Sequence, residues 1–318
     1  MGEIDIGDAA TAGLRMIARQ PIAVLCWGLL MAVYVGLLFV LFSGGVASAI
    51  STLIANGAAA PPLSLVLQLV LNAFGFLALL IVGTQLLDVV FRAAAIRAEL
   101  EPQASGFAYM RLGSQEAWIL AASFVFGLVL FGANFLMSIP LAIVTMAASI
   151  GELAASNGSS ASQGLGMAAG VLVLRFFGQL IITAVSIWLW LRLLLGVVMS
   201  YHERQFRLFE SWTLTRGHVW RMFLTMLLVT LMLIALGLVM FIVCAITFGV
   251  TLGVVAQDPK TFFAQPPATW LAALTPLMVV ILIWIVVSVG FTNALMWGAV
   301  ARMWRQLTPE ADAARTFA

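Results

Sequence analysis

The stretch 219–255, VWRMFLTMLLVTLMLIALGLVMFIVCAITFGVTLGVV, has one charged residue, Arg221, followed by a long uncharged apolar run. A helix needs about 20 such residues to cross the hydrocarbon core of a bilayer. The sequence contains five further runs of this kind, near 22–43, 65–91, 117–149, 167–200 and 270–303. It therefore predicts an all-α, polytopic membrane protein with six transmembrane helices.

The composition excludes other classes of protein. Hydrophobic residues make up 63% of the 318 residues and charged residues 9%, against about 45–50% and 25% in soluble globular proteins. Too few polar side chains are present to cover the surface of a soluble fold. The same composition is too hydrophobic for a disordered chain and has too little charge for a nucleic-acid-binding domain. The two cysteines, Cys26 and Cys244, lie in apolar runs and do not indicate a disulfide scaffold.

The arginines predict the topology, because arginine-rich short loops stay in the cytoplasm. If both termini share one side, the loops between 44–64, 150–166 and 256–269 face the other, and Lys260 is their only basic residue. We expect a bacterial inner-membrane protein with both termini and a tail, 309–318, in the cytoplasm. The arginines that then share the inner side are Arg15, Arg19, Arg92, Arg97, Arg111, Arg204, Arg207, Arg216, Arg221, Arg302, Arg305 and Arg315.

A threefold internal repeat is a further prediction for the single membrane domain, 1–308. The returning spans end in related segments, 86–92, 194–200 and 296–302, at offsets that divide the domain into 1–101, 102–203 and 204–308. Each third would contribute one helical hairpin.

Short amphipathic segments are predicted before two of the spans. In the first, Ala10, Gly13, Leu14 and Ile17 share one helical face, opposite Asp8, Thr11, Arg15 and Arg19, and Asp5 or Asp8 can cap its start. In the second, 206–217, the shared face holds Leu208, Ser211, Trp212 and Thr215. Such helices lie in the membrane interface, and they act either as lipid-sensing elements or as plain linkers between spans.

These segments also resemble a known family. The motifs are Asp5-Ile6-Gly7-x-Ala9 and Leu214-Thr215-Arg216-Gly217-x-x-Trp220-Arg221. They are similar to the six-span membrane domain fused to some bacterial glycerophosphodiester phosphodiesterases, which also occurs as stand-alone uncharacterised inner-membrane proteins. The resemblance implies an all-helical membrane bundle. It transfers no catalytic residue, and the phosphodiesterase barrel has no counterpart in this sequence.

Two charged residues inside predicted spans are the strongest candidates for a site, since a charge in hydrocarbon is costly. Counted from the inner ends of the returning spans, Asp88 lies about 6 Å and Arg192 about 12 Å into the membrane. Asp88 could pair with Arg192 across a polar layer. Alternatively, Arg92 neutralises Asp88 one turn later and Arg192 extends toward the inner surface. The predicted layer comprises Thr84, Gln85, Asp88, Arg192, Thr292 and Asn293.

Arginines at the inner rim are candidates for contacts with anionic lipid headgroups, which basic juxtamembrane residues attract. They are Arg15, Arg19, Arg207, Arg216 and Arg221. No metal site or cofactor is expected: His202 and His218 are the only histidines, and no nucleophile–base pair lies within a span.

Three classes of function remain, in descending order. The first is a non-enzymatic membrane protein that binds lipid or a partner, another membrane protein or a second copy of the chain, through its interfacial helices and arginine-rich rim. The second is a transporter or channel that uses the layer around Asp88 and Arg192. The third is a lipid-modifying enzyme, for which no catalytic set can be assembled.

Overall fold

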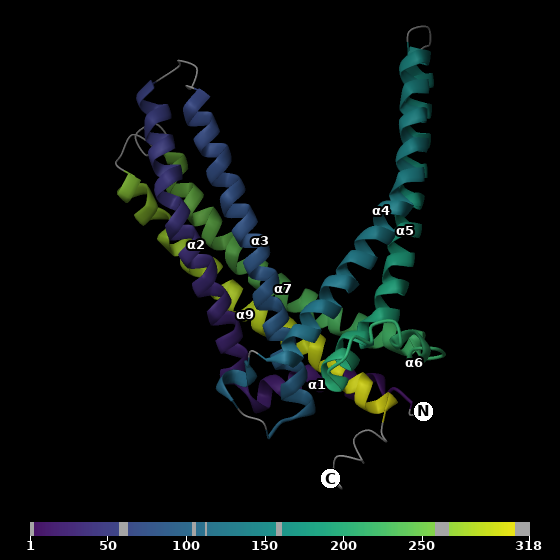
Figure 1. The fold of residues 1–318 in the computed structure, drawn as a ribbon. Coiled ribbons are helices and arrows are strands. Elements are labelled where there is room, and N and C mark those ends of the chain that lie inside the picture. Colours follow the sequence, from purple (N-terminus) through teal and green to yellow (C-terminus); the bar gives the residue numbers. More distant parts are fainter. Residues whose placement is uncertain are drawn as a thin grey trace. The chain divides into compact units, whose positions relative to one another are not determined.

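The computed structural model describes residues 3–56, 63–103, 106–111, 113–156, 161–257 and 267–308, and this part of the chain is all-α with no strand. Six of its helices are long and apolar enough to cross a membrane (Figure 1), which confirms the predicted fold class. The six are α2 (Pro21–Asn56), α3 (Leu63–Leu100), α4 (Ser114–Ser156), α5 (Ala161–Glu203), α7 (Val219–Gln257) and α9 (Pro267–Leu307).

Three short helices accompany them: α1 (Ile6–Arg19), η1 (Phe107–Tyr109) and α6 (Ser211–Leu214). The long helices exceed the predicted spans, and α4 and α5, with 43 residues each, reach about 65 Å. Helix α4 continues through Pro140 and changes direction along its length (Figure 1). Lys260 and the tail 309–318 lie outside the described residues.

The chain forms two compact units, Met1–Glu116 with Leu224–Ala318, and Ala117–Phe223. The first and last predicted thirds thus contribute most of one unit and the middle third most of the other. The internal repeat itself stays a prediction.

Helix α9 is the centre of the first unit, where α1, α2 and α3 all pack against it. Glycines make the closest approaches. A Cβ atom on Gly28 of α2 would lie 1.8 Å from the carbonyl oxygen of Val286, and one on Gly290 would lie 2.4 Å from that of Val24. Helices α2 and α9 are therefore in backbone contact, as small residues allow in membrane proteins.

Helix α1 packs against α9 in the same way. A Cβ atom on Gly13 would lie 2.4 Å from the Cα atom of Leu295, and one on Gly298 would lie 3.1 Å from the Cα atom of Gly13. Asp5 caps α1, as one of the two predicted residues, by accepting a hydrogen bond from the amide of Asp8 at 3.0 Å.

The residues of the predicted apolar face of α1 differ in their burial within the protein. Ala10 and Gly13 are buried, whereas Leu14 is 43% exposed. The buried set is completed by Ala9, Ala12 and Met16, so the packing face is rotated toward small residues. The reason is α9: its backbone lies too close to leave room for a leucine.

The second predicted amphipathic segment is a compact turn instead of a long interfacial helix, because α6 spans only four residues. Its predicted apolar face is largely buried: Leu208, Ser211 and Thr215 are fully covered. A Cβ atom on Gly196 of α5 would lie 2.5 Å from the carbonyl oxygen of Leu208. The segment therefore folds back onto the end of α5 and packs there.

Two glycines of α2 give a matched test of the backbone contact with α9. Gly28→Ala places a methyl group into the backbone of Val286, whereas Gly36→Ala has its nearest neighbour at 4.0 Å, the side chain of Leu282. We expect Gly28→Ala to destabilise the protein by about 1–3 kcal/mol, the usual effect of overpacking, and Gly36→Ala to leave the melting temperature in detergent unchanged. Equal melting temperatures for the two variants would contradict the contact.

Candidate functional site

Asp88 of the predicted polar layer forms an ion pair with Arg92 one turn later on α3. The guanidinium of Arg92 also lies over the ring of Trp297 on α9, 5.1 Å from its centroid. A cation over a tryptophan face is favourable, and more so where water is scarce. Asp88 and Arg92 thus join α3 to α9 through a local pair and one aromatic contact.

The uncharged members of the layer mostly bond within their own helices. Thr84 donates to the carbonyl oxygen of Leu80 at 2.6 Å, and Asn293 donates to that of Val289 at 3.1 Å. Gln85 and Thr292 are exposed. The structure therefore brings Asp88 and Asn293 into one unit on packed helices, without gathering the layer into a polar pocket among the described residues.

Arg192 has its own partners in the second unit. Its Nη1 atom donates to the carbonyl oxygen of Trp212 at 3.2 Å and to Oγ1 of Thr215 at 3.3 Å. The guanidinium lies 5.6 Å from the ring centroid of Trp188 and 5.3 Å from that of Trp212. The two indoles meet edge to face, with centroids 5.1 Å apart, so Arg192 is enclosed by aromatic rings and oxygen acceptors.

The Arg192 site explains part of the segment that carries the family resemblance. Ser211 donates to the carbonyl oxygen of Arg192 at 2.9 Å, so the segment is bonded to α5 in both directions. Gly217 has φ +86°, a left-handed conformation that glycine adopts without strain. Thr215 and Gly217 thus have structural roles here, in holding and turning the chain before α7.

The local alternative describes both charges. Arg92 neutralises Asp88, and α6 with its flanking residues satisfies Arg192. Each charge thus has partners in its own unit, and the pairing of Asp88 with Arg192 stays a prediction. The sequence carried a signal for this arrangement: Trp188 precedes Arg192 by four residues, the spacing of neighbours on one helix face.

A cluster around Asp8 was missed, because α1 was expected to lie alone in the interface. Its carboxylate accepts hydrogen bonds from Arg15, from Arg302 at 2.6 Å and from Gln306 at 2.9 Å. Gln306 also accepts from the amide of Asp5 at 3.1 Å. The start of α1 and the end of α9 are therefore bonded together, so both ends of the described chain lie at the same end of this unit.

Burial raises the pKa of Asp8, but the hydrogen bonds and charges of Arg302 and Arg15 outweigh this effect and hold the pKa below its usual value of 3.8. A carboxyl group with a lowered pKa stabilises the folded state above its unfolded pKa. This stabilisation is lost as the pH falls through the lower, folded pKa.

A second missed pair holds the connection between α3 and α4. Arg97 forms a buried ion pair with Glu116 and donates to the carbonyl oxygen of Tyr109 at 2.6 Å. Trp27 of α2 donates to the carbonyl oxygen of Ala108 at 2.9 Å, which fixes the two left-handed residues of η1, Ala108 with φ 48° and Tyr109 with φ 59°. Arg97 and Glu116 are both buried, and a buried ion pair of this kind fixes geometry more than it adds stability.

The rim arginines fall into two groups. Arg15 pairs with Asp8 at 2.6 Å, and Arg207 pairs with Glu203 and Glu210, each at 2.6 Å. Arg19 and Arg216, in contrast, are exposed. Among the described residues, no group of three or more His, Cys, Asp or Glu side chains could hold a metal ion.

Removing Arg192 tests the local site against the pairing hypothesis. We expect Arg192→Leu to lower stability by about 2–4 kcal/mol, because a desolvated cation–π contact and two charged hydrogen bonds are lost. Melting in detergent and proteolysis within 204–217 measure the effect. Adding Asp88→Asn should not rescue the variant; rescue would restore the pairing hypothesis, since it would mean that a stranded carboxylate caused the loss.

Acidification tests the Asp8 cluster. As the pH falls below about 3.8, the wild-type protein should lose the stabilisation that the Asp8 carboxylate provides, because protonation removes its ion pairs. Asp8→Asn should be less stable at neutral pH and should show a smaller loss on acidification, measured as melting temperature against pH. Asp5→Asn keeps an oxygen at the cap and should retain the wild-type dependence.

Comparison with protein-family models, curated proteins and solved structures finds no match. The resemblance to the phosphodiesterase-linked membrane domain therefore stays a prediction. The molecule has six helices that could cross a membrane. Asp88 and Arg192 contact neighbouring residues of their own units, and Arg19 and Arg216 are exposed near the ends of the spans.

Proposed function

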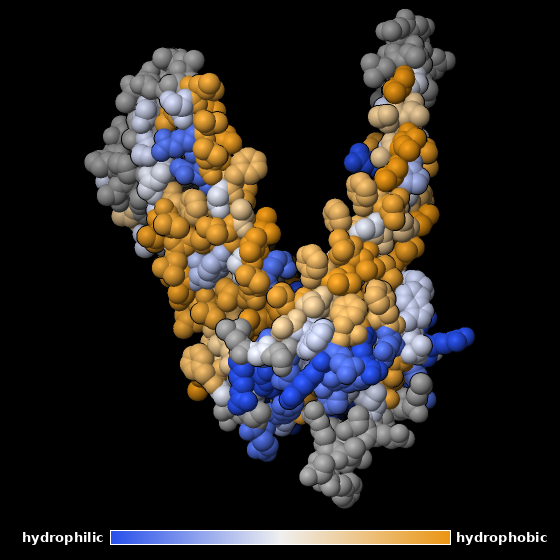
Figure 2. Space-filling model, viewed as in Figure 1, coloured by the Kyte–Doolittle hydropathy of each residue, from blue (hydrophilic) through white to orange (hydrophobic). Residues whose placement is uncertain are grey.

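We propose that the protein is a non-enzymatic membrane protein that binds anionic phospholipid at one face of the membrane, the cytoplasmic face of the bacterial inner membrane in the predicted topology. In each unit, hydrophilic residues gather at the end that holds α1 or α6, next to apolar helix surface (Figure 2). An anionic headgroup with its acyl chains matches such a junction of basic and apolar surface.

The observation that carries the proposal is the combination of exposed arginine with large exposed apolar side chains. In the first unit, Arg19 precedes Ile22, which is 76% exposed, by three residues. In the second, Arg216 precedes Trp220, which is 69% exposed and stacks on Phe223. Exposed tryptophan is typical of the headgroup level of a bilayer, where an exposed arginine meets lipid phosphate.

The geometry narrows the predicted lipid contacts. Arg15 and Arg207 are engaged by acidic side chains, and Arg221 is half-buried. Arg19 and Arg216 are therefore the residues that we assign to headgroup binding. The transport alternative gains no specific support, because Asp88 and Arg192 are satisfied locally.

Arg19→Gln and Arg216→Gln test the proposal. Each basic residue near an anionic surface contributes about 1 kcal/mol, so each substitution should weaken binding of phosphatidylglycerol about fivefold. The readout is native mass spectrometry of the full chain released from its own membrane and then titrated with phosphatidylglycerol. Added salt should reduce binding to the wild type more than to the double variant.

Arg207→Gln is the matched control, because it removes the same charge from an arginine already engaged by two carboxylates. It should alter binding less than either test variant. Equal retention of phosphatidylglycerol by the wild type and by the Arg19→Gln/Arg216→Gln double variant would overturn the assignment.

A further inference from the structure

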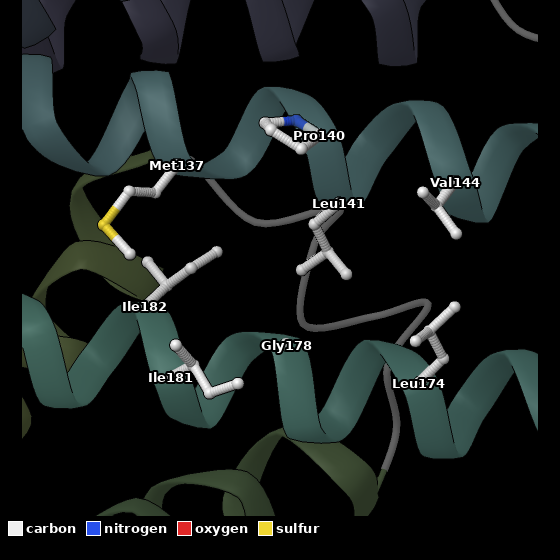
Figure 3. A pocket seen from close by; sticks show the side chains of 8 residues that line it. All are labelled: Met137, Pro140, Leu141, Val144, Leu174, Gly178, Ile181 and Ile182. Carbon is white, nitrogen blue, oxygen red and sulfur yellow. The ribbon is translucent and has the colours of Figure 1, made fainter.

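A pocket of about 270 Å³ lies between α4 and α5 within the second unit (Figure 3). The α4 wall is formed by Met137, Pro140, Leu141 and Val144. All four belong to the candidate membrane span Gln115–Gly151.

The α5 wall is formed by Leu174, Gly178, Ile181 and Ile182, in the span Ala169–Glu203. Leu141 points toward Gly178 (Figure 3), and a Cβ atom on Gly178 would lie 2.5 Å from Cδ1 of that leucine, so the two residues pack directly against each other. Leu174 and Ile181 are 43% and 61% exposed, so the pocket opens to its surroundings. An apolar pocket does not hold ordered water, which leaves a hydrocarbon chain as its occupant in a bilayer.

Arg175 gives this pocket a charged end. It precedes Ile182 by seven residues, or two helical turns, so both lie on one face of α5 about 10 Å apart along the axis. Arg175 is exposed. The sequence has no Asp or Glu between Ala117 and Gly151 or between Ala169 and His202, so these stretches of α4 and α5 offer it no carboxylate.

The depths agree with a bound phospholipid. Arg175 lies 25 residues before Ser200, about 37 Å along the helix, which exceeds the hydrocarbon thickness of about 30 Å. When α5 stands along the membrane normal, Arg175 therefore reaches the headgroups of the far leaflet, and Ile182 lies within the chains of that leaflet. Phosphate at Arg175 would place an acyl chain along the pocket.

We propose that α4 and α5 form a binding site for one anionic phospholipid, with the headgroup phosphate on Arg175 and an acyl chain in the pocket that Met137, Leu174 and Ile181 line beside the contact of Leu141 with Gly178. In the predicted topology this lipid belongs to the outer leaflet. The site is independent of the rim arginines, Arg19 and Arg216, because neither of them lines the pocket. Within its own unit, the pocket lies far along α5 from the helix end that Arg216 follows.

The test is native mass spectrometry of the delipidated full chain in detergent, titrated with phosphatidylglycerol or with phosphatidylcholine of the same acyl chains. Arg19→Gln/Arg216→Gln is the background, so that binding at the rim is weakened and any loss reports on this site. We expect one phosphatidylglycerol to bind in preference to phosphatidylcholine. Arg175→Gln should weaken it about tenfold, as expected for loss of a charged contact, and Arg175→Lys should retain most of the affinity.

Ile181→Trp tests the acyl chain, because the indole would occupy the pocket from its open edge. Leu180→Trp is its control: Leu180 is 48% exposed and lies on another face of α5. We expect Ile181→Trp to weaken binding about tenfold and Leu180→Trp to leave it unchanged. Glycerol phosphate, which has the headgroup charge without a chain, should not compete.

Three results would overturn the proposal: equal binding of the two lipids, no effect of Arg175→Gln, or equal effects of the two tryptophan substitutions. Competition by glycerol phosphate would assign Arg175 to a free phosphate instead of a lipid. Because the background already lacks Arg19 and Arg216, none of these results bears on the function proposed for the rim.

Discussion

The backbone of α9 is the surface on which the first unit is built. Gly28 and Gly290 bring α2 against it, and Gly13 and Gly298 bring α1 against it. Burial of apolar surface cannot hold helices together in lipid, since lipid chains are as apolar as leucine. Close packing must replace it, and only residues without a Cβ atom allow these distances.

The close packing in turn decides which polar contacts form. Because α1 lies directly on α9, Asp8 reaches Arg302 and Gln306, and the capping residue Asp5 reaches Gln306 as well. Two arginines and an amide group stabilise the charged form of this carboxylate, whereas burial without such partners would favour its protonated form. The glycine contact and the Asp8 cluster thus hold the same two helices, α1 and α9, together.

The periodicity of apolar residues was sufficient to predict six long helices, because a bilayer requires uninterrupted apolar runs whatever the tertiary contacts are. Asp88 could also be assigned correctly to Arg92 as the local alternative, since that pair lies within one helix. Contacts between distant segments were beyond such reasoning. Nothing in the spacing near Asp8 or Arg97 indicates that Arg302 or Glu116 lies opposite, and only the fold reveals that Gly13 is the contact point of α1.

The three arginines inside the spans differ in the partners that the protein offers them. Arg92 has Asp88 and Trp297, and Arg192 has two tryptophans and two oxygen acceptors. These contacts join each arginine to neighbouring segments of its own unit. Arg175, by contrast, lies in a stretch of α5, Ala169–His202, that has no Asp or Glu. The stretch Ala117–Gly151 of α4 has none either, so the counter-ion of Arg175 must come from outside these two stretches. The most abundant anion at the surface of a bilayer is lipid phosphate, and the apolar pocket that extends from Leu174, next to Arg175, to Ile182 matches an acyl chain of the same molecule.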